Sequence, residues 1–212
     1  MAAMRSVCMG EARVSAHLAG GTHHAFYDRG EGFCVFSDIA VASNLALKEF
    51  HDIKRILIID LDVHQGNGNA VLFEDNPSVY TFSMHCKANY FSKIRQSDLD
   101  VEVEVGATDD TYLSLLAQWL PKLLHEQQPD LVFYQAGVDT LGTDRLGKLG
   151  LSQDGLALRN RMVYEEVRKQ GAKLVVTMGG GYPTDLDPLS NSYKTVIQAH
   201  VNVYKDCIPQ PL

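Results

Sequence analysis

Three polar side chains in one short stretch could together bind a metal ion. The segment ILIIDLDVHQGNG at residues 56–68 runs from four aliphatic residues into Asp60, Asp62 and His64. An aliphatic run of this kind is typical of a strand buried on both faces of a parallel sheet. Because side chains alternate along a strand, we expect the three polar residues on one side and the aliphatic residues between them on the other.

Polar and charged side chains at the end of a buried strand need a hydrogen-bonding partner or a metal ion. An isolated carboxylate costs several kcal/mol to bury, and open α/β folds bind their ligands at the carboxyl ends of their strands. Asp and His are usual ligands of Zn²⁺. Taken alone, the D-x-H pattern is equally explained by an Asp that caps the next helix and a His packed in a loop.

Reactive or strained residues also end other expected strands. They are His23 and His24, Ser83, Asp139, and the sequence Gly179-Gly180-Gly181-Tyr182. Parallel strands present their carboxyl ends at one edge of a sheet, so we expect these groups to converge. Asp62, His64 and Asp139 then supply three metal ligands, and the open fourth position is typical of a catalytic zinc site.

The remaining groups could complete a hydrolytic site. Water bound to Zn²⁺ reaches a pKa of about 7, and one imidazole of the pair His23-His24 could act as general base and acid. Asp60 could orient a histidine N–H, and the Tyr182 hydroxyl could stabilise an oxyanion. Each group alone has an ordinary explanation as a turn or surface residue. Together they predict a metal-assisted hydrolase of an amide or ester.

The elements that position these residues alternate between strands and helices, which predicts a mostly parallel sheet in one three-layer α-β-α domain over residues 1–212. We expect residues 1–13 to be irregular. Ser37-Asp38, Thr108-Asp109-Asp110 and Ser152 are expected to cap helices. The expected strands are 14–19, 55–60, 79–83, 100–105, 131–134 and 174–177, and the expected helices are 37–50, 69–73, 108–124, 152–171 and 190–204.

Composition excludes several classes of function. The net charge is −7 and no Lys/Arg cluster occurs, so direct binding to nucleic acid is disfavoured. No apolar run approaches the roughly 18 residues that a membrane span requires. The four cysteines are scattered without a C-x-x-C pair, and the N-terminus has no signal-peptide pattern, which favours an intracellular protein with reduced thiols.

The same residues carry a resemblance to a known family. The segments are GGTHHA (20–25), GEGFCVFSDIA (30–40), IDLDVHQGNG (59–68), YQAGVD (134–139), DRLGKLGLS (144–152) and GGGY (179–182). Their combination resembles the zinc-dependent histone deacetylases of the arginase/deacetylase superfamily, most closely class IV and bacterial or plant members. The resemblance implies the arginase/deacetylase fold, a nuclear or cytoplasmic chromatin regulator, and removal of acyl (acetyl) groups from acyl-lysine of histones or other proteins.

The resemblance also implies roles for individual residues. Zn²⁺ would be held by Asp62, His64 and Asp139, and K⁺ by oxygen atoms of Asp60, Asp62, His64, Ser83 and Met84. In catalysis, His24 would be general base and acid, His23 its electrostatic partner held by Asp60, and Tyr182 the group that polarises the acyl carbonyl. The acyl-lysine tunnel would be lined by Gly32 and Phe33, with Tyr90 or Phe91 opposite and Gly180 near the channel.

Two departures from the family pattern are visible. Class I enzymes carry Asp where this chain has Asn67, so we expect His24 to have a lower pKa than in those enzymes. Only 22 residues precede His23, whereas the family has a much longer segment there. We therefore expect a truncated domain that lacks N-terminal strands, exposes the edge of the strand at 14–19 and has weak activity.

Two alternative functions compete with the deacylase. A binuclear manganese ureohydrolase on the same fold would need carboxylates where the chain has Gly66 and Leu141, so it is disfavoured. A catalytically weak or inactive deacetylase that acts as a binding or regulatory module stays open, although the intact metal and acid–base residues argue against it.

Overall fold

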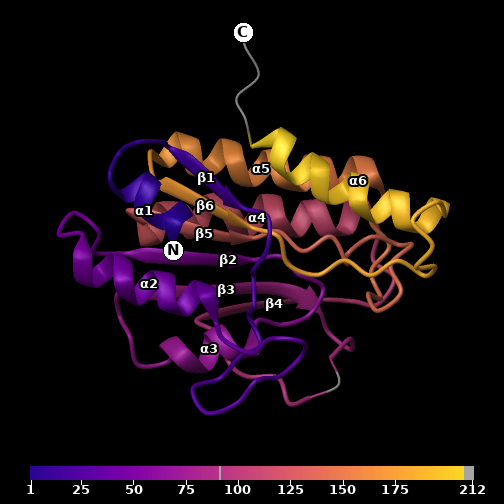
Figure 1. Ribbon diagram of the computed structural model, residues 1–212, viewed down its shortest axis with the longest axis horizontal. Helices are drawn as coiled ribbons and strands as arrows, with labels where there is room; N and C mark the ends of the chain where they lie inside the picture. Colours follow the sequence, from indigo (N-terminus) through magenta and orange to yellow (C-terminus); the bar gives the residue numbers. More distant parts are fainter. Residues whose placement is uncertain (91, 208–212) are drawn as a thin grey trace, which may run out of the picture.

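A parallel sheet forms the centre of the computed structural model, which describes residues 1–90 and 92–207 (Figure 1). Within these residues the sheet has six strands in the order β1-β6-β5-β2-β3-β4, and every neighbouring pair is parallel. The strands are β1 (Val14–His17), β2 (Ile56–Asp60), β3 (Val79–Cys86), β4 (Leu99–Val103), β5 (Leu131–Gln135) and β6 (Lys173–Thr177). The predicted mostly parallel sheet is confirmed.

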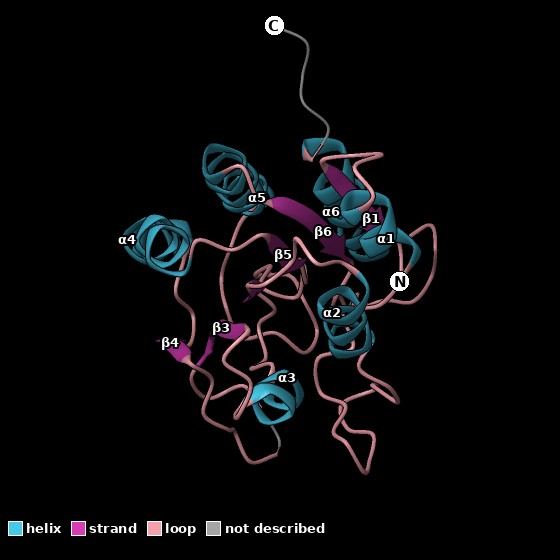
Figure 2. Ribbon diagram, turned by 90° about the vertical axis from the view of Figure 1, so that its left-hand side faces the viewer, coloured by secondary structure: helices cyan, strands magenta, loops and turns pink. Residues whose placement is uncertain are grey.

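Helices cover both faces of this sheet, as the end-on view in Figure 2 shows. One layer contains α1 (Ala2–Cys8), α2 (Asp38–Glu49) and α3 (Asn67–Phe73), and the other contains α4 (Asp109–Gln127), α5 (Gln153–Gln170) and α6 (Asn191–Asp206). Each layer contributes side chains to its own apolar core against the sheet. The three-layer α-β-α architecture is therefore confirmed.

The central strand β2 shows how the sequence sets the two faces. Leu57 and Ile59 pack in the core under α4, α5 and α6, whereas Ile56 and Ile58 pack in the core under α1 and α2. Burying each such side chain contributes about 1.5–3 kcal/mol, so a one-residue slip in register would be strongly unfavourable. Leu61 and Val63 belong to the first core, as predicted from their alternation with the acidic residues.

The order of the strands creates a crevice between β2 and β5. After β2 the chain moves outward to β3 and β4, and then returns to β5 on the other side of β2 before it reaches β6. The direction of winding thus reverses between β2 and β5, and α/β folds bind ligands outside the carboxyl ends of strands at such a reversal. These two strands lead into Asp62, His64 and Asp139.

Ser37 and Ser152 cap their helices as predicted, and Ser190 caps α6 although no cap was predicted there. The hydroxyl oxygens of Ser37, Ser152 and Ser190 each accept a hydrogen bond from a backbone N–H in the first turn of α2, α5 and α6. The prediction for Thr108 is wrong in one respect, because its side chain makes no cap hydrogen bond at the start of α4. Among residues 1–90 and 92–207, no helix combines the length and the apolar character that crossing a bilayer would require.

Two predictions about local structure are wrong. Residues 1–13 are not irregular, because Ala2–Cys8 form α1. Met4 and Val7 are fully buried there, and their spacing of three residues gives the short helix an apolar face that packs on the sheet. Strand β3 continues to Cys86, so Ser83 lies inside the strand and not at its end.

Candidate active site

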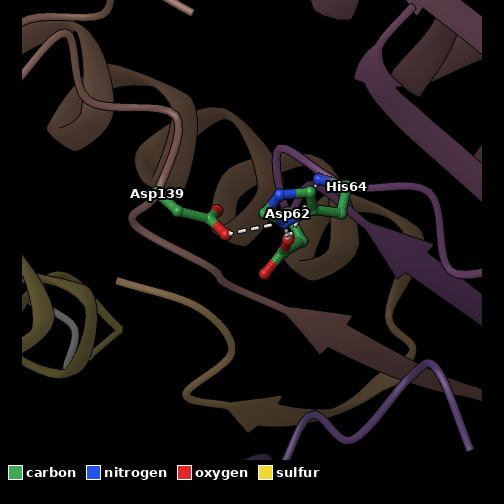
Figure 3. Close-up of side chains that lie close together, drawn as sticks. All are labelled: Asp62, His64 and Asp139. Atoms are coloured by element: carbon green, nitrogen blue, oxygen red, sulfur yellow. Dashed lines mark hydrogen bonds and ion pairs between the residues drawn. The ribbon is translucent and has the colours of Figure 1, made fainter. Parts of the chain in front are cut away.

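Asp62, His64 and Asp139 converge at the carboxyl ends of β2 and β5. Figure 3 shows Asp139 approaching the other two side chains from a separate loop. The His64 Nδ1 atom lies 3.1 Å from Asp62 Oδ1 and 3.3 Å from Asp139 Oδ2. Tetrahedral Zn²⁺ with bonds of about 2.0–2.1 Å separates its ligand atoms by about 3.3 Å. The candidate ligand atoms of all three residues lie within 4.8 Å of one another, a spacing compatible with one shared metal ion.

Burial and charge at these residues also fit a cation. The Oδ1 atom of Asp139 accepts a hydrogen bond from the Val63 N–H, but its buried Oδ2 has no hydrogen-bond partner among the described residues. Burial, followed by the nearby charge of Asp62, raises the pKa of Asp139 to about 7. Two buried carboxylates side by side repel each other unless a positive charge joins them. The arrangement therefore fits a divalent metal ion.

Two glycines let backbone approach the carboxylates closely. A Cβ atom at Gly137 would overlap the Asp62 carboxylate, and one at Gly180 would overlap the Asp139 carboxylate. The N–H of Gly180 donates to Asp62 Oδ2 at 2.9 Å. Gly180, predicted to lie near the substrate channel, is thus placed directly against the candidate metal ligands.

His23 is paired with a carboxylate, as predicted. Its Nδ1 atom lies 2.7 Å from Asp60 Oδ2, and its Nε2 atom lies 3.8 Å from Asp62 Oδ1. Burial lowers the pKa of His23, but the charges of Asp60 and Asp62 outweigh burial and raise the pKa to about 9. The two carboxylates therefore favour the protonated form of His23.

His24 is paired with a neutral group. Its Nδ1 atom lies 2.8 Å from Asn67 Oδ1. Burial, followed by the positive charge of His23, lowers the pKa of His24 to about 2. Burial is the largest cause of this low pKa, and the expected difference from class I enzymes stays a prediction. The imidazole is neutral at neutral pH and has a lone pair that can accept a proton, although so low a pKa makes it a weak base.

A cavity of about 370 Å³ leads to this site. Its walls include His24, Gly32, Phe33, His64, Ala88, Asn89, Tyr90, Leu146, Lys148 and Tyr182. Gly32, Phe33 and Tyr90, predicted at the tunnel, thus line the same cavity as Tyr182, and Phe91 lies outside the described residues.

Aromatic rings form much of the wall of this cavity. The Phe33 and Tyr182 rings lie 5.9 Å apart, and the Tyr90 ring stacks on His24 at 4.6 Å. The Tyr182 N–H donates to Asp144 Oδ2 at 2.6 Å, which fixes the backbone of this residue. Burial, followed by the charges of Asp62 and Asp139, raises the pKa of Tyr182, so its hydroxyl keeps its proton.

Three residues that support the candidate ligands were not predicted. Gln135 Nε2 donates to Asp62 Oδ2 at 3.0 Å. Asn89 Nδ2 lies 3.5 Å from His64 Nε2 and donates to a backbone carbonyl at 2.8 Å. Arg159 in α5 is fully buried, and its Nη1 atom donates to the carbonyls of Leu61 at 3.1 Å and Gly137 at 2.8 Å.

One of these three carries a signal in the sequence. Arg159 stands three residues after Leu156 and four before Val163, both of which are buried in α5. A cation on the apolar face of a helix must find polar partners inside the protein.

Comparison with known proteins agrees with this geometry. The family model of the histone deacetylase domain matches residues 1–200. An uncharacterised protein of Picosynechococcus sp. is 44% identical over 191 residues, which cover 90% of this chain and 63% of that protein. Histone deacetylase 2 of Arabidopsis thaliana is 39% identical over 169 residues, which cover 78% of this chain and 43% of that protein.

A yeast relative extends the comparison. Histone deacetylase RPD3 of Saccharomyces cerevisiae is 34% identical over 184 residues, which cover 82% of this chain and 41% of that protein. The chain thus spans 41% to 63% of the length of these three relatives. Because the family model matches residues 1–200 of the chain and the candidate site is assembled, the chain belongs to the histone deacetylase family.

Proposed function

We propose that the chain is a zinc-dependent deacylase that removes an acyl group from N-acyl-lysine in histones or other proteins. The observation that carries this proposal is the position of a neutral histidine, His24, in the same cavity as His64 of the Asp62–His64–Asp139 cluster. A metal site beside a proton acceptor is what hydrolysis of an amide needs.

The metal cluster would hold the cofactor. Asp62, His64 and Asp139 would bind Zn²⁺, which when bound lowers the pKa of water and polarises a carbonyl group. Gln135 and the Gly180 N–H hold Asp62 in place through its second oxygen. Arg159 holds the backbone on both sides of the crevice. A structural K⁺ near Asp60 and Ser83 is part of the same proposal.

The two histidines and Tyr182 would divide the acid–base work. His24 Nδ1 is occupied by Asn67, so Nε2 is the atom that takes a proton from the attacking water and returns it to the leaving lysine amine. His23, charged through Asp60, supplies a fixed positive charge beside it. The Tyr182 hydroxyl donates a hydrogen bond to the oxygen on which negative charge develops.

The cavity suits the proposed substrate. Its aromatic walls can pack against the methylene groups of a lysine side chain, while its inner end offers polar groups to an amide. The net charge of −7 would favour approach of a cationic protein such as a histone. We propose no direct contact with nucleic acid or membrane, and an intracellular location, nuclear or cytoplasmic.

The test combines metal analysis with an assay. The purified chain is expected to bind one zinc per molecule and to hydrolyse a fluorogenic acyl-lysine peptide. The variant His24→Ala is expected to keep its zinc and to lose about 100-fold or more of kcat, because general acid–base catalysis contributes about 10²–10⁴-fold.

Other outcomes would assign the chain differently. Stoichiometric zinc and tight peptide binding without turnover would favour a non-catalytic binding or regulatory module. Turnover that is insensitive to His24→Ala would contradict the proposed roles of the two histidines.

A further inference from the structure

The side-chain amide of Asn67 lies between an imidazole and a carboxylate. Asn67 Oδ1 is 2.8 Å from His24 Nδ1, and Asn67 Nδ2 donates to Glu31 Oε1 at 2.9 Å. Asn67 is fully buried at the start of α3, so water does not compete for either contact. The three side chains therefore form a continuous chain of hydrogen bonds that ends at His24.

The chemistry of this chain fixes the direction of each hydrogen bond. A carboxamide can turn by 180°, so Asn67 by itself could present either an acceptor or a donor to His24. An ionised carboxylate only accepts, so Glu31 requires the Asn67 NH₂ group to face it. The Asn67 oxygen then faces His24 and requires a hydrogen on Nδ1, which leaves the Nε2 lone pair free.

Glu31 is itself held firmly and stays ionised. The Tyr90 hydroxyl donates to the same Oε1 atom at 2.9 Å, and Arg29 Nε lies 3.9 Å from Oε2. Burial raises the pKa of Glu31, but the hydrogen bonds from Asn67 and Tyr90 outweigh burial and lower the pKa below its ordinary value. The carboxylate is only 16% exposed.

A tight turn places this carboxylate at the cavity. Backbone hydrogen bonds join Glu31 and Cys34 in both directions, at 3.0 and 2.8 Å. The two residues between them, Gly32 and Phe33, have φ values of +52° and +65°, which is the pattern of a hairpin turn with two left-handed central residues. One turn thus sets both the aromatic wall at Phe33 and the carboxylate behind Asn67.

We infer that Glu31 is a positioning residue: it orients the Asn67 amide and thereby selects the form of His24 whose Nε2 accepts a proton. The catalytic consequence rests on the proposed deacylase function, whereas the selected form of His24 can be observed without any turnover. An aspartate in place of Asn67 would accept from either oxygen and would need no such orientation.

The first experiment reads the protonation of His24 directly. In zinc-loaded, ¹⁵N-histidine-labelled protein at neutral pH, the signals that disappear in His24→Ala are expected to show hydrogen on Nδ1 and none on Nε2. In Glu31→Lys, the ammonium only donates, so the Asn67 amide is expected to turn and the His24 hydrogen to move to Nε2. Hydrogen on Nε2 in the wild type, or an unchanged pattern in Glu31→Lys, would overturn the inference.

The second experiment asks whether a matched change restores the original form. Glu31→Lys is expected to lower kcat about 100-fold, the lower end of a general acid–base contribution, with little change in KM. The double variant Glu31→Lys/Asn67→Asp pairs an acceptor with His24 again and is expected to recover kcat to within about 10-fold of wild type, with hydrogen back on Nδ1. The same change of charge at an exposed site, Glu11→Lys, is the control and is expected to leave kcat unchanged.

These outcomes separate the inference from the proposed function. If Glu31→Lys is unstable, the double variant and the wild-type spectrum still decide the question. A folded, zinc-loaded double variant that stays inactive would overturn the catalytic role of Glu31. Absence of turnover in wild type, with the expected His24 spectrum, would contradict the deacylase proposal alone.

Discussion

The floor and the rim of the cavity are built in different ways. The floor is the buried polar cluster next to His24 and His64 of the cavity wall. It consists of Asp60, Asp62, Asp139 and His23, each at most 4% exposed and each on or shortly after β1, β2 or β5. The rim consists of loop residues, and Phe33 there is 83% exposed. The floor is thus part of the folded core, whereas the rim is attached to it.

The fold itself sets the positions of the floor residues more directly than those of the rim residues. The parallel pairing of β2 and β5 places Asp60 opposite Gln135, and the residues that follow both strands meet immediately beyond. Buried polar groups there are held by further buried groups such as Arg159. Rim residues contribute little to the core, so their positions depend on turns and on neighbouring loops.

The strongest way to test the floor is to remove one candidate ligand. Asp139→Asn is expected to weaken zinc binding by more than about 100-fold and to abolish turnover, because even supporting contacts contribute about 10–100-fold to metal affinity. Zinc affinity measured by competition with a chelator checks this.

The melting temperatures of the metal-free proteins test whether Asp139 also contributes to packing. Without zinc, Asp139→Asn is expected to melt at the same temperature as wild type or higher, because the variant removes one of two buried charges that repel each other. A metal-free variant that melts well below wild type would show that Asp139 serves packing instead of metal binding. Asp187→Asn, on an exposed loop, is the matched control.

Tyr182 lies in the cavity wall beside Phe33, and its substitution is expected to have the next largest effect on turnover. Tyr182→Phe keeps the ring beside Phe33 but removes the hydroxyl, so kcat is expected to fall about 10²–10³-fold, as for loss of one oxyanion donor. Zinc content and KM are expected to stay close to wild type. Steady-state kinetics on the fluorogenic peptide measure this, and a change confined to KM would assign the ring to binding alone.

The sequence predicts the floor well for a physical reason. The alternation of Asp60 and Asp62 with Leu61 determines which face each residue occupies, and the order of the strands then brings Asp139 to the same place. Both follow from local pattern and from the geometry of parallel sheets. The pairing of His23 with Asp60 follows once the loop after β1 reaches the end of β2.

The supporting residues could not be predicted in the same way. Arg159 reaches carbonyls that lie 98 and 22 residues away in the chain, so its role depends on how α5 packs on the sheet. Glu31 contacts Asn67 because a turn with two positive φ values, one of them at Phe33, places it there. No pattern in the sequence predicts this turn. The contacts of the rim residues therefore became known only from the structure.

A substitution of Arg159 tests whether the floor depends on contacts from helix α5. Arg159→Met keeps most of the volume but leaves buried carbonyls without donors, at about 1–3 kcal/mol for each unsatisfied group. The free energy of unfolding is expected to fall by about 3 kcal/mol, and zinc affinity by about 10-fold. Arg161→Met, at an exposed position of the same helix, is the control, and equal stability of the two variants would contradict a supporting role for Arg159.

Phe33→Gly is expected to have the smallest effect of these variants, and it is expected to raise stability where Arg159→Met lowers it. The Phe33 side chain is mostly exposed and its φ of +65° is unfavourable for a residue with a Cβ atom, so Phe33→Gly is expected to raise the free energy of unfolding by about 0.5–1 kcal/mol. The same variant removes an aromatic wall of the cavity and is expected to raise KM about 5-fold, since a lost apolar contact of about 1 kcal/mol corresponds to that factor. Thermal melts and peptide kinetics on one protein preparation measure both. Loss of stability in Phe33→Gly would mean that the rim, like the floor, is part of the core, because only a buried contact could outweigh the relief of the backbone.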